Sequence, residues 1–390
     1  MDWKSCAFAL AICALGSSAA IAAPKVRFKV IHEFHETDGV TSMVGPLVKG
    51  IDGRLYGVLS DGGQYDQGVL FSITPQGNFK LLYSFTGGLD GAQPNTLFRD
   101  PDGHLYGATA FGGADPDSGV LFSVGADGTP TVAYNFMGSD GGQIQPSHVQ
   151  FKQGSFYGTT SISGNGSGTV YRFTPPSTVE TLHEFGVFNP EQFSPYFGLS
   201  KADGVFYGTT YTISSVPNFS LFGTVFRITD AGELSVLYTF TGGADGSRPV
   251  GPPVRAADGN FYGVTSEGGE FGCGTIYRID ATGAFTLVHA FTGGDRDAPD
   301  GGGCLPFGTL VKGKDGRLYG STWRGGNEFG LGLIFRLSVS GEFEVLHRFT
   351  DPDQSSVTYS LIEGRAGTFF GMRDGGAGNT GQIFKLVVRD

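Results

Sequence analysis

The side chains best suited to bind or react with a ligand stand at two consecutive positions before a recurring glycine-rich loop. The pairs differ from copy to copy, and they are Ser60-Asp61, Ala110-Phe111, Ser161-Ile162, Tyr211-Thr212, Ser266-Glu267, Trp323-Arg324 and Arg373-Asp374. Aromatic rings at such positions could stack on sugars, because a flat ring buries a large area at small entropic cost. Loop packing is the competing interpretation. Our ligand-binding candidates are Trp323, Arg324, Phe111, Tyr211, Asp61 and Asp374. The pair Trp323-Arg324 leads, since no other copy has a Trp there.

Cleavage of a polysaccharide by a lyase would need a cation beside the uronate and a base at the sugar carbon. Arg324 or Arg373 could supply the cation, and His148 or Tyr211 could supply the base. His148 stands at the start of an inner strand, where other copies have Thr or apolar residues. A structural histidine with satisfied hydrogen bonds is the competing interpretation.

Hydrolysis of a glycoside would instead need two carboxyl groups at a defined separation. The candidates are Asp61, Glu267 and Asp374, which lie in different copies of the repeat, so the sequence leaves their separation open. The sequence shows no Ser-His-Asp order, His/Cys metal motif or phosphate-binding loop.

An acidic cluster at Asp295, Asp297 and Asp300 could hold Ca²⁺, which takes several oxygen ligands. The cluster lacks a fixed ligand spacing. We therefore expect no cofactor, with Ca²⁺ as the alternative.

The repeat itself contains an aromatic–Gly step, a Gly-Gly doublet in most copies, and then Gly-x-aliphatic-aromatic. The steps lie 50 to 57 residues apart, at Tyr56-Gly57, Tyr106-Gly107, Tyr157-Gly158, Tyr207-Gly208, Tyr262-Gly263, Tyr319-Gly320 and Phe370-Gly371. A period of this length with many β-formers is typical of a propeller blade. Within the first unit, apolar residues alternate at period two in the segments 45–49, 54–59, 69–73 and 79–85, which predicts four antiparallel strands. We expect each Gly after the aromatic to let a ring of the neighbouring blade pack closely.

The outermost strand of each blade ends in a Phe. Six copies of this strand follow the other strands of their blades, and they end at Phe85, Phe136, Phe185, Phe240, Phe291 and Phe349. The seventh copy of this strand is at the other end of the chain, in residues 26–34. The sequence therefore predicts an all-β fold: a seven-bladed β-propeller with four antiparallel strands per blade. Its N-terminal strand closes the C-terminal blade, which removes open sheet edges.

Two kinds of residue that invite a functional interpretation are better explained by structure. His32, His183, His289 and His347 share one repeat position with Tyr83, Tyr134 and Tyr238, so this position is structural. Asp-Gly pairs such as Asp90-Gly91 and Asp245-Gly246 recur in the connections between blades, where Asp favours turns.

The ends of the chain and its charge bear on location and partners. Residues 1–22 read as a secretory signal peptide ending in Ala20-Ile21-Ala22, with the propeller in residues 23–390. The leader's apolar run is too short to span a bilayer. With a net charge of −11 and 16% charged residues, the chain is unsuited to nucleic acid or anionic membranes. We expect a soluble monomer, secreted to the periplasm or the extracellular space, with a polysaccharide or surface protein as partner.

Removal of the leader leaves two cysteines, Cys273 and Cys304. In an exported protein, two cysteines favour a disulfide over a metal site. The predicted topology supports this pairing. It places Cys273 in the loop between strands two and three of the fifth blade, and Cys304 in the connection to the sixth, on the same face.

The repeat resembles the GloVer tandem repeats of bacterial exported proteins along essentially the whole mature chain. The segments closest to that pattern are Gly223-Thr224-Val225-Phe226 and Gly274-Thr275-Ile276-Tyr277. The resemblance implies an exported propeller and no established activity. Two functions from different classes follow from the residues. The first is binding of a glycan or surface protein through the long-loop face. The alternative is a polysaccharide lyase or glycoside hydrolase at the same channel mouth.

Overall fold

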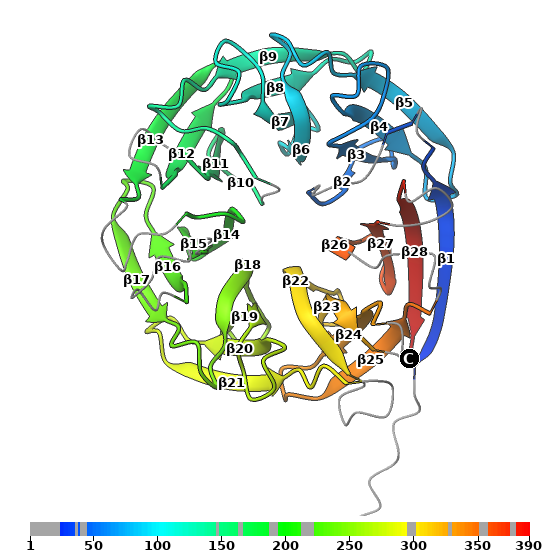
Figure 1. Cartoon of the computed structure of the whole chain (residues 1–390), viewed down its shortest axis with the longest axis vertical. Coiled ribbons are helices and arrows are strands. Elements are labelled where there is room, and N and C mark those ends of the chain that lie inside the picture. Colours follow the sequence, from blue (N-terminus) through cyan, green and yellow to red (C-terminus); the bar gives the residue numbers. More distant parts are fainter. Residues whose placement is uncertain are drawn as a thin grey trace, which may run out of the picture.

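Seven four-stranded antiparallel sheets are arranged in a ring around a central axis in the computed structural model (Figure 1). The structure describes residues 24–35, 38–39, 45–145, 148–162, 167–186, 194–211, 222–294, 302–326, 330–350, 358–374 and 380–390. Within these ranges, no helix is long and apolar enough to cross a membrane. The prediction of an all-β, seven-bladed propeller is confirmed.

The first three blades follow the chain in order, each from its innermost to its outermost strand. Blade 1 consists of β2 (Val48–Lys49), β3 (Leu55–Leu59), β4 (Val69–Ile73) and β5 (Phe79–Ser84). Blade 2 consists of β6 (Ala92–Arg99), β7 (Leu105–Phe111), β8 (Val120–Val124) and β9 (Pro130–Asn135). Blade 3 consists of β10 (Gln150–Lys152), β11 (Ser155–Thr160), β12 (Thr169–Thr174) and β13 (Thr178–Glu184).

The next three blades repeat the same order. Blade 4 consists of β14 (Leu199–Ala202), β15 (Val205–Thr210), β16 (Thr224–Ile228) and β17 (Leu234–Thr239). Blade 5 consists of β18 (Ser247–Arg255), β19 (Phe261–Glu267), β20 (Thr275–Ile279) and β21 (Phe285–Ala290). Blade 6 consists of β22 (Gly303–Lys312), β23 (Leu318–Gly325), β24 (Leu333–Leu337) and β25 (Phe343–Arg348).

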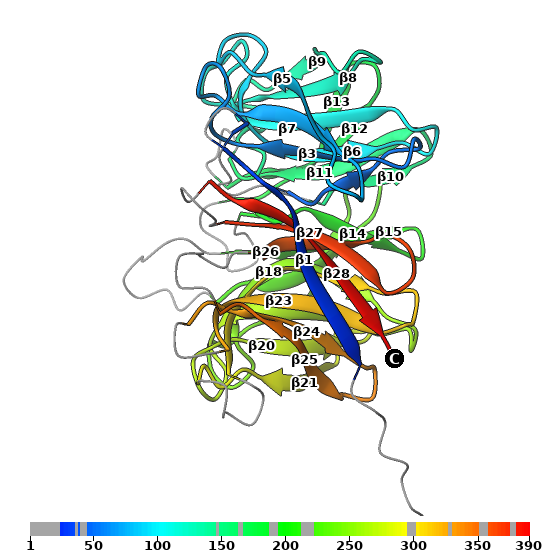
Figure 2. The ribbon, with the colours of Figure 1, turned by 90° about the vertical axis from the view of Figure 1, so that its right-hand side faces the viewer.

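Blade 7 is built from both ends of the chain. Its inner strands are β26 (Thr358–Glu363), β27 (Thr368–Arg373) and β28 (Gln382–Arg389), and its outermost strand is β1 (Lys25–Glu33). Strands β1 and β28 run antiparallel side by side, with Phe28 opposite Leu386 and Val30 opposite Phe384 (Figure 2). The predicted closure by the N-terminal strand is confirmed.

The glycine of each aromatic–Gly step lies under a ring of its own blade. Gly57 in β3 pairs with Phe71 in β4, and a methyl group at Gly57 would lie 2.4 Å from the Phe71 ring. Gly371 has the same relation to Phe384, at 2.5 Å. The expectation that a neighbouring blade supplies this ring is therefore corrected. The cross-strand partner occupies the space because it stands directly opposite the glycine.

The Asp-Gly residues between blades are bound to the outer strands. Asp90 accepts hydrogen bonds from the Thr86 amide and, at 3.1 Å, from the Tyr83 hydroxyl. Asp245 accepts the Tyr238 hydroxyl at 3.0 Å, and His32 stands at the same repeat position, 3.5 Å from Asp38. Burial and the aspartate bond raise the pKa of Tyr238 to about 12. These Asp, Tyr and His side chains hold the blade connections in place.

Candidate functional site

Loops between the second and third strands share one face of the ring with the connections between blades. The Gly113 amide of a loop in blade 2 donates to the Gly88 carbonyl in the preceding connection at 2.9 Å. Cys273 and Cys304 form a disulfide on this face, with Cα atoms 4.5 Å apart, which confirms the predicted pairing. We call this side the loop face, and the opposite side, with its short turns, the turn face.

A left-handed residue begins the innermost strand of several blades. Gln93 in β6, Arg248 in β18 and Leu305 in β22 have φ values of 52° to 55°, and Gln143, which precedes β10, has a φ of 46°. The Arg248 amide donates to the Phe222 carbonyl of the previous blade at 2.8 Å, and the Leu305 amide donates likewise to the Cys273 carbonyl at 3.0 Å. These bonds between blades stabilise a conformation that L-residues seldom adopt. At Arg248, the guanidinium meets both the previous blade's Tyr211 and its own blade's Glu267.

Five aromatic side chains from blades 4 and 6 touch in sequence on the loop face. We call them the aromatic strip: Tyr196, Phe197, Tyr211, Phe307 and Trp323. Phe197 lies 5.8 Å from Tyr211 and 5.9 Å from Phe307, both edge to face. The Phe307 ring is in turn 6.2 Å from the Trp323 ring. The contact between Phe197 and Phe307 joins blade 4 to blade 6, whose innermost strands β14 and β22 flank β18 of blade 5 in the ring (Figure 1).

Trp323 is the exposed end of the strip, and Arg324 lies beside it. Trp323 is 42% exposed, whereas Phe197 is 7% exposed and packs in the core. The Arg324 guanidinium lies 5.9 Å from the centre of the Trp323 ring, within the range of a cation–π contact. The site therefore offers a partly open indole face beside an exposed cation.

The other end of the strip has paired charges. The Arg248 guanidinium lies 5.8 Å from the centre of the Tyr211 ring and forms an ion pair with Glu267 at 2.5 Å. Burial, together with the nearby Tyr211, raises the pKa of Tyr196 to about 12. The Tyr196 phenol is therefore a poor source of a phenolate base at neutral pH.

The backbone of His148 contacts the strip, but the residue lines a cavity on the side of blades 7, 1 and 2. Its amide donates to the Phe197 carbonyl at 3.3 Å, and its carbonyl accepts the Leu199 amide at 2.8 Å. The side chain helps to line a cavity of about 420 Å³ between the first strands of blades 7, 1, 2 and 3. Burial lowers the pKa of His148 to about 4. The imidazole is therefore neutral at pH 7 and binds a proton weakly.

Arg373 points away from the channel mouth. It is 4% exposed, donates two hydrogen bonds to Gln382, and lies 5.0 Å from the centre of the Phe349 ring. Its role is to fill the space between β27 and the outer strands of blades 6 and 7. The geometry therefore does not bring Arg373 together with His148, Trp323 and Arg324.

The other candidates lie around the ring outside the strip. Asp61 accepts a hydrogen bond from Ser60 at 2.9 Å in blade 1, and Phe111 ends β7 in blade 2 opposite Ala92. Asp374 follows β27 in blade 7. The proposed hydrolase carboxylates Asp61, Glu267 and Asp374 thus belong to blades 1, 5 and 7. Thr212 and the acidic cluster Asp295, Asp297 and Asp300 lie outside the described residues, within which no group of three or more His, Cys, Asp or Glu could hold a metal ion.

Sequence reasoning found Trp323, Arg324, Tyr211 and Glu267, and it missed Arg248, Tyr196, Phe197 and Phe307. A sequence pattern shared by several copies of the repeat could have indicated Arg248. Arg248 follows a small residue and precedes a Pro, as Gln93 and Leu305 do. Phe307 follows Pro306 as the buried Val250 follows Pro249, so its position resembles a core position of blade 5.

The fold and the loop-face site define a seven-bladed β-propeller with an aromatic patch at its channel mouth. The chain belongs to the Gloeobacter/Verrucomicrobia repeat family, whose model matches residues 19–222 and 218–389. A comparison with curated protein sequences gives no match.

Several solved structures share the fold. A streptogramin B lyase aligns with a TM-score of 0.60 at 15% identity, over 93% of this chain and 98% of the lyase chain. Virginiamycin B lyase from Staphylococcus aureus aligns with a TM-score of 0.59 at 15% identity, over 93% and 99% of the two chains. A puromycin-hydrolyzing peptidase of Mycobacterium tuberculosis aligns with a TM-score of 0.53 at 9% identity, over 90% of this chain and 52% of the peptidase. At these identities the likeness shows the fold alone.

Proposed function

We propose that this protein is an exported, non-catalytic propeller that binds a glycan through the exposed end of the aromatic strip. The observation that carries the proposal is the juxtaposition of Trp323, 42% exposed, with the exposed guanidinium of Arg324. An indole face stacks on the apolar face of a sugar ring, and the guanidinium donates several hydrogen bonds to hydroxyl or carboxylate oxygens.

The support behind the indole makes the platform rigid. Phe307 meets the Trp323 ring edge to face, and Phe197 behind it is buried in the core. A ring held from behind loses little freedom when a ligand stacks on it, so less binding energy is lost to ordering.

The enzymatic alternative has less support from the geometry. Its base candidate His148 has a lowered pKa and lines a separate cavity, and Arg373 is buried in blade 7. Two structural neighbours are lyases by name, but a likeness at 15% identity does not carry their activity to this chain. An increase in absorbance from unsaturated sugar ends on incubation with uronate polymers would favour the lyase.

Tryptophan fluorescence tests the glycan site directly, because Trp3 and Trp323 are the only tryptophans in the sequence. In a chain that begins at Ala23, all tryptophan emission comes from the proposed platform. Titration with a panel of neutral and uronate-containing polysaccharides should shift or quench this emission for at least one member. Trp323→Ala should abolish binding of that glycan measured by calorimetry.

Tyr65→Ala is the matched control, since Tyr65 is an exposed aromatic residue, 49% exposed, in the corresponding loop of blade 1. Its binding should equal that of the unchanged chain. Equal loss in both variants, or no response to any glycan in the panel, would contradict the proposal.

Export rests on the leader-like residues 1–22 and on the disulfide, which forms in oxidising compartments. Mass spectrometry of the protein isolated from its source should give a mature N-terminus near Ala23. Retention of the whole leader in the accumulated protein would contradict export.

A further inference from the structure

A second cavity lies on the turn face, between blade 7 and blade 1. We call it the seam cavity. Its volume is about 590 Å³, which falls within the range of small-molecule sites. Its lining includes Lys49, Asp52 and Arg54 from blade 1 and Arg365, Phe370 and Lys385 from blade 7. It is separate from the aromatic strip, which belongs to blades 4 and 6 on the opposite face.

The seam cavity borders Phe370 of blade 7, which cannot make a hydrogen bond that its equivalents in blades 1, 5 and 6 make. In blades 1, 5 and 6, the hydroxyl of the aromatic–Gly step donates to the Asp of the adjacent turn. These bonds are Tyr56 to Asp52 at 3.0 Å, Tyr262 to Asp258 at 2.9 Å, and Tyr319 to Asp315 at 2.7 Å. In blade 7, the equivalent residues are Phe370 and Ala366, so both partners are missing.

The neighbouring blade does not fill the vacated space. At the interfaces between blades 3 and 4, 4 and 5, and 6 and 7, a second ring packs on the tyrosine. Phe206 lies 4.2 Å from Tyr157, Phe261 lies 4.1 Å from Tyr207, and Phe369 lies 4.1 Å from Tyr319. At the seam, the corresponding residue of blade 1 is Leu55, which clusters with Phe370. A hydroxyl, a carboxylate and a ring are therefore all absent from one interface.

Positive charge gathers in the seam cavity. Lys49, Arg365 and Lys385 make no ion pair with any residue that the structure describes, whereas Lys152, Arg255 and Arg336 on the same face are paired with aspartates of neighbouring blades. Lys152 contacts Asp230 at 2.6 Å, and Arg336 contacts Asp390 at 2.7 Å.

The remaining charged groups of the cavity are already bound. The Arg54 guanidinium donates to Ser72 and to the Asn78 carbonyl, and Asp52 accepts the Tyr56 hydroxyl. Glu363, which borders Lys49, accepts the Lys314 and Gly367 amides at 2.9 and 3.0 Å. Burial and the nearby Lys314 lower the pKa of Lys49. In a chain with a net charge of −11, this local surplus of cations favours an anion.

We propose that the seam cavity binds a small organic anion, a sugar acid or sugar phosphate. Its anionic group contacts Lys49, Arg365 and Lys385, and its body packs near Phe370 and Leu55. Lysine and arginine donate charge-assisted hydrogen bonds to carboxylate and phosphate oxygens. The volume leaves room for more than an inorganic ion.

Isothermal titration calorimetry at low ionic strength tests the proposal with galacturonate, glucose 6-phosphate, glucose and inorganic phosphate. Binding of galacturonate or glucose 6-phosphate, with no binding of glucose, supports it and shows which anionic group is preferred. Inorganic phosphate that binds as tightly as glucose 6-phosphate would overturn the assignment to an organic ligand. The absence of binding by both charged sugars would overturn the site.

Variants locate the binding in the cavity. Lys49→Met and Arg365→Met should each weaken binding by about tenfold, the equivalent of one lost charge-assisted hydrogen bond. Lys201→Met is the matched control, since Lys201 is an exposed turn-face lysine of blade 4 outside the cavity, and its affinity should be unchanged. Weakening by Lys201→Met equal to that of the other two would overturn the site, because only net charge would then matter.

The double variant Ala366→Asp with Phe370→Tyr restores in blade 7 the pair found in blades 1, 5 and 6. It should abolish binding of the charged sugar while the unfolding midpoint stays at or above that of the unchanged chain. Retained affinity in this folded variant would overturn the proposal. The Trp323 fluorescence response to a glycan should be the same in this variant, so failure here and failure of the proposed function are distinguishable.

Discussion

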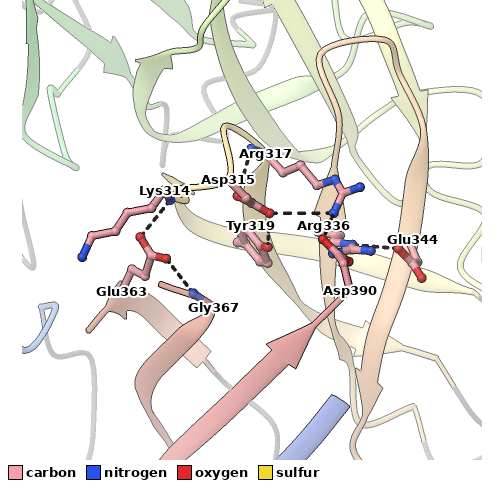
Figure 3. A network of polar contacts seen from close by, with 9 residues as sticks. All are labelled: Lys314, Asp315, Arg317, Tyr319, Arg336, Glu344, Glu363, Gly367 and Asp390. Carbon is pink, nitrogen blue, oxygen red and sulfur yellow. Dashed lines mark hydrogen bonds and ion pairs between the residues drawn. The ribbon is translucent and has the colours of Figure 1, made fainter. Parts of the chain in front are cut away.

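Blade 7 has two neighbours, and its turn-face interfaces with them are built differently. At the interface with blade 6, Tyr319 packs on Phe369 at 4.1 Å and donates to Asp315. Arg336, 3% exposed, contacts Glu344 and the Asp390 side chain at 2.7 Å each (Figure 3). At the interface with blade 1, Phe370 meets Leu55, and the seam cavity takes the place of such a network.

The same repeat can therefore form a closely packed interface between blades or one that contains a cavity. Blades 6, 7 and 1 share the four-stranded sheet, the glycine of the aromatic–Gly step and the ring that lies over this glycine. The difference lies in a few positions, of which Ala366 and Phe370 are the clearest. We expect stability to depend on what the two sides share and binding to depend on where they differ.

The largest predicted effect concerns the shared core. Phe335→Ala in blade 6 and Phe384→Ala in blade 7 should each lower the free energy of unfolding by about 3–5 kcal/mol. Both rings are fully buried, and each lies over the glycine of its own blade, Gly320 or Gly371. Denaturant unfolding followed by circular dichroism measures both. A large loss of free energy of unfolding for one variant and almost none for the other would contradict the claim that the two blades have equivalent cores.

A smaller effect should distinguish the cations of the two interfaces. Arg336→Met should destabilise the fold by about 1–3 kcal/mol, because it removes hydrogen bonds to charged partners from a buried guanidinium. Arg365→Met should change stability by no more than about 0.5 kcal/mol, since Arg365 is exposed at the seam. Equal losses in the two variants would remove the distinction between a structural and a ligand-binding cation.

The pH dependence of stability should reflect the closed interface. The hydrogen bond from Arg336 lowers the pKa of Asp390 in the folded protein. The stabilisation is therefore fully present above the ordinary Asp pKa of about 3.9 and is lost as pH falls through the lower folded value. Asp390→Asn should be less stable than the unchanged chain at pH 7, and the difference should shrink below about pH 3.9. A difference that stays constant over this range would exclude the carboxylate as its source.

The sequence predicted the fold well because its signals are local. Gly57 and its equivalents, the period-two strands and the outer-strand copy at residues 26–34 each specify part of a blade. Trp323-Arg324 was found because the pair departs from the repeat. Phe197 and Phe307 were missed, since their contact joins blades 4 and 6 and depends on how the ring closes. The change at Phe370 was visible in the sequence, but its meaning requires knowing that Tyr56 and Tyr319 donate to aspartates.

Arg373 shows the limit of position-by-position reasoning. It directly precedes Asp374 before a Gly-Gly doublet, as Trp323 precedes Arg324, yet the strand register places it where blade 6 has Thr322, two residues after the glycine of the aromatic–Gly step. Its guanidinium lies over Phe28 and Phe349 and donates to Gln382. This register position is buried in blade 6 as well, where Thr322 is 1% exposed. Counting back from the Gly-Gly doublet misplaces Arg373, because blade 7 has one residue fewer than blade 6 between the aromatic–Gly step and the doublet.

A double-mutant cycle in blade 7 tests most directly the claim that the missing Tyr–Asp pair opens the seam. The four chains are the unchanged protein, Ala366→Asp, Phe370→Tyr and the double variant, compared by their free energies of unfolding. We expect the gain in free energy of unfolding of the double variant to exceed the sum of the gains of the two single variants. The excess should be about 0.5–1.5 kcal/mol, the net contribution of one hydrogen bond. Additivity within about 0.3 kcal/mol would contradict it, because the two residues would then not meet in blade 7 as they do in blades 1, 5 and 6.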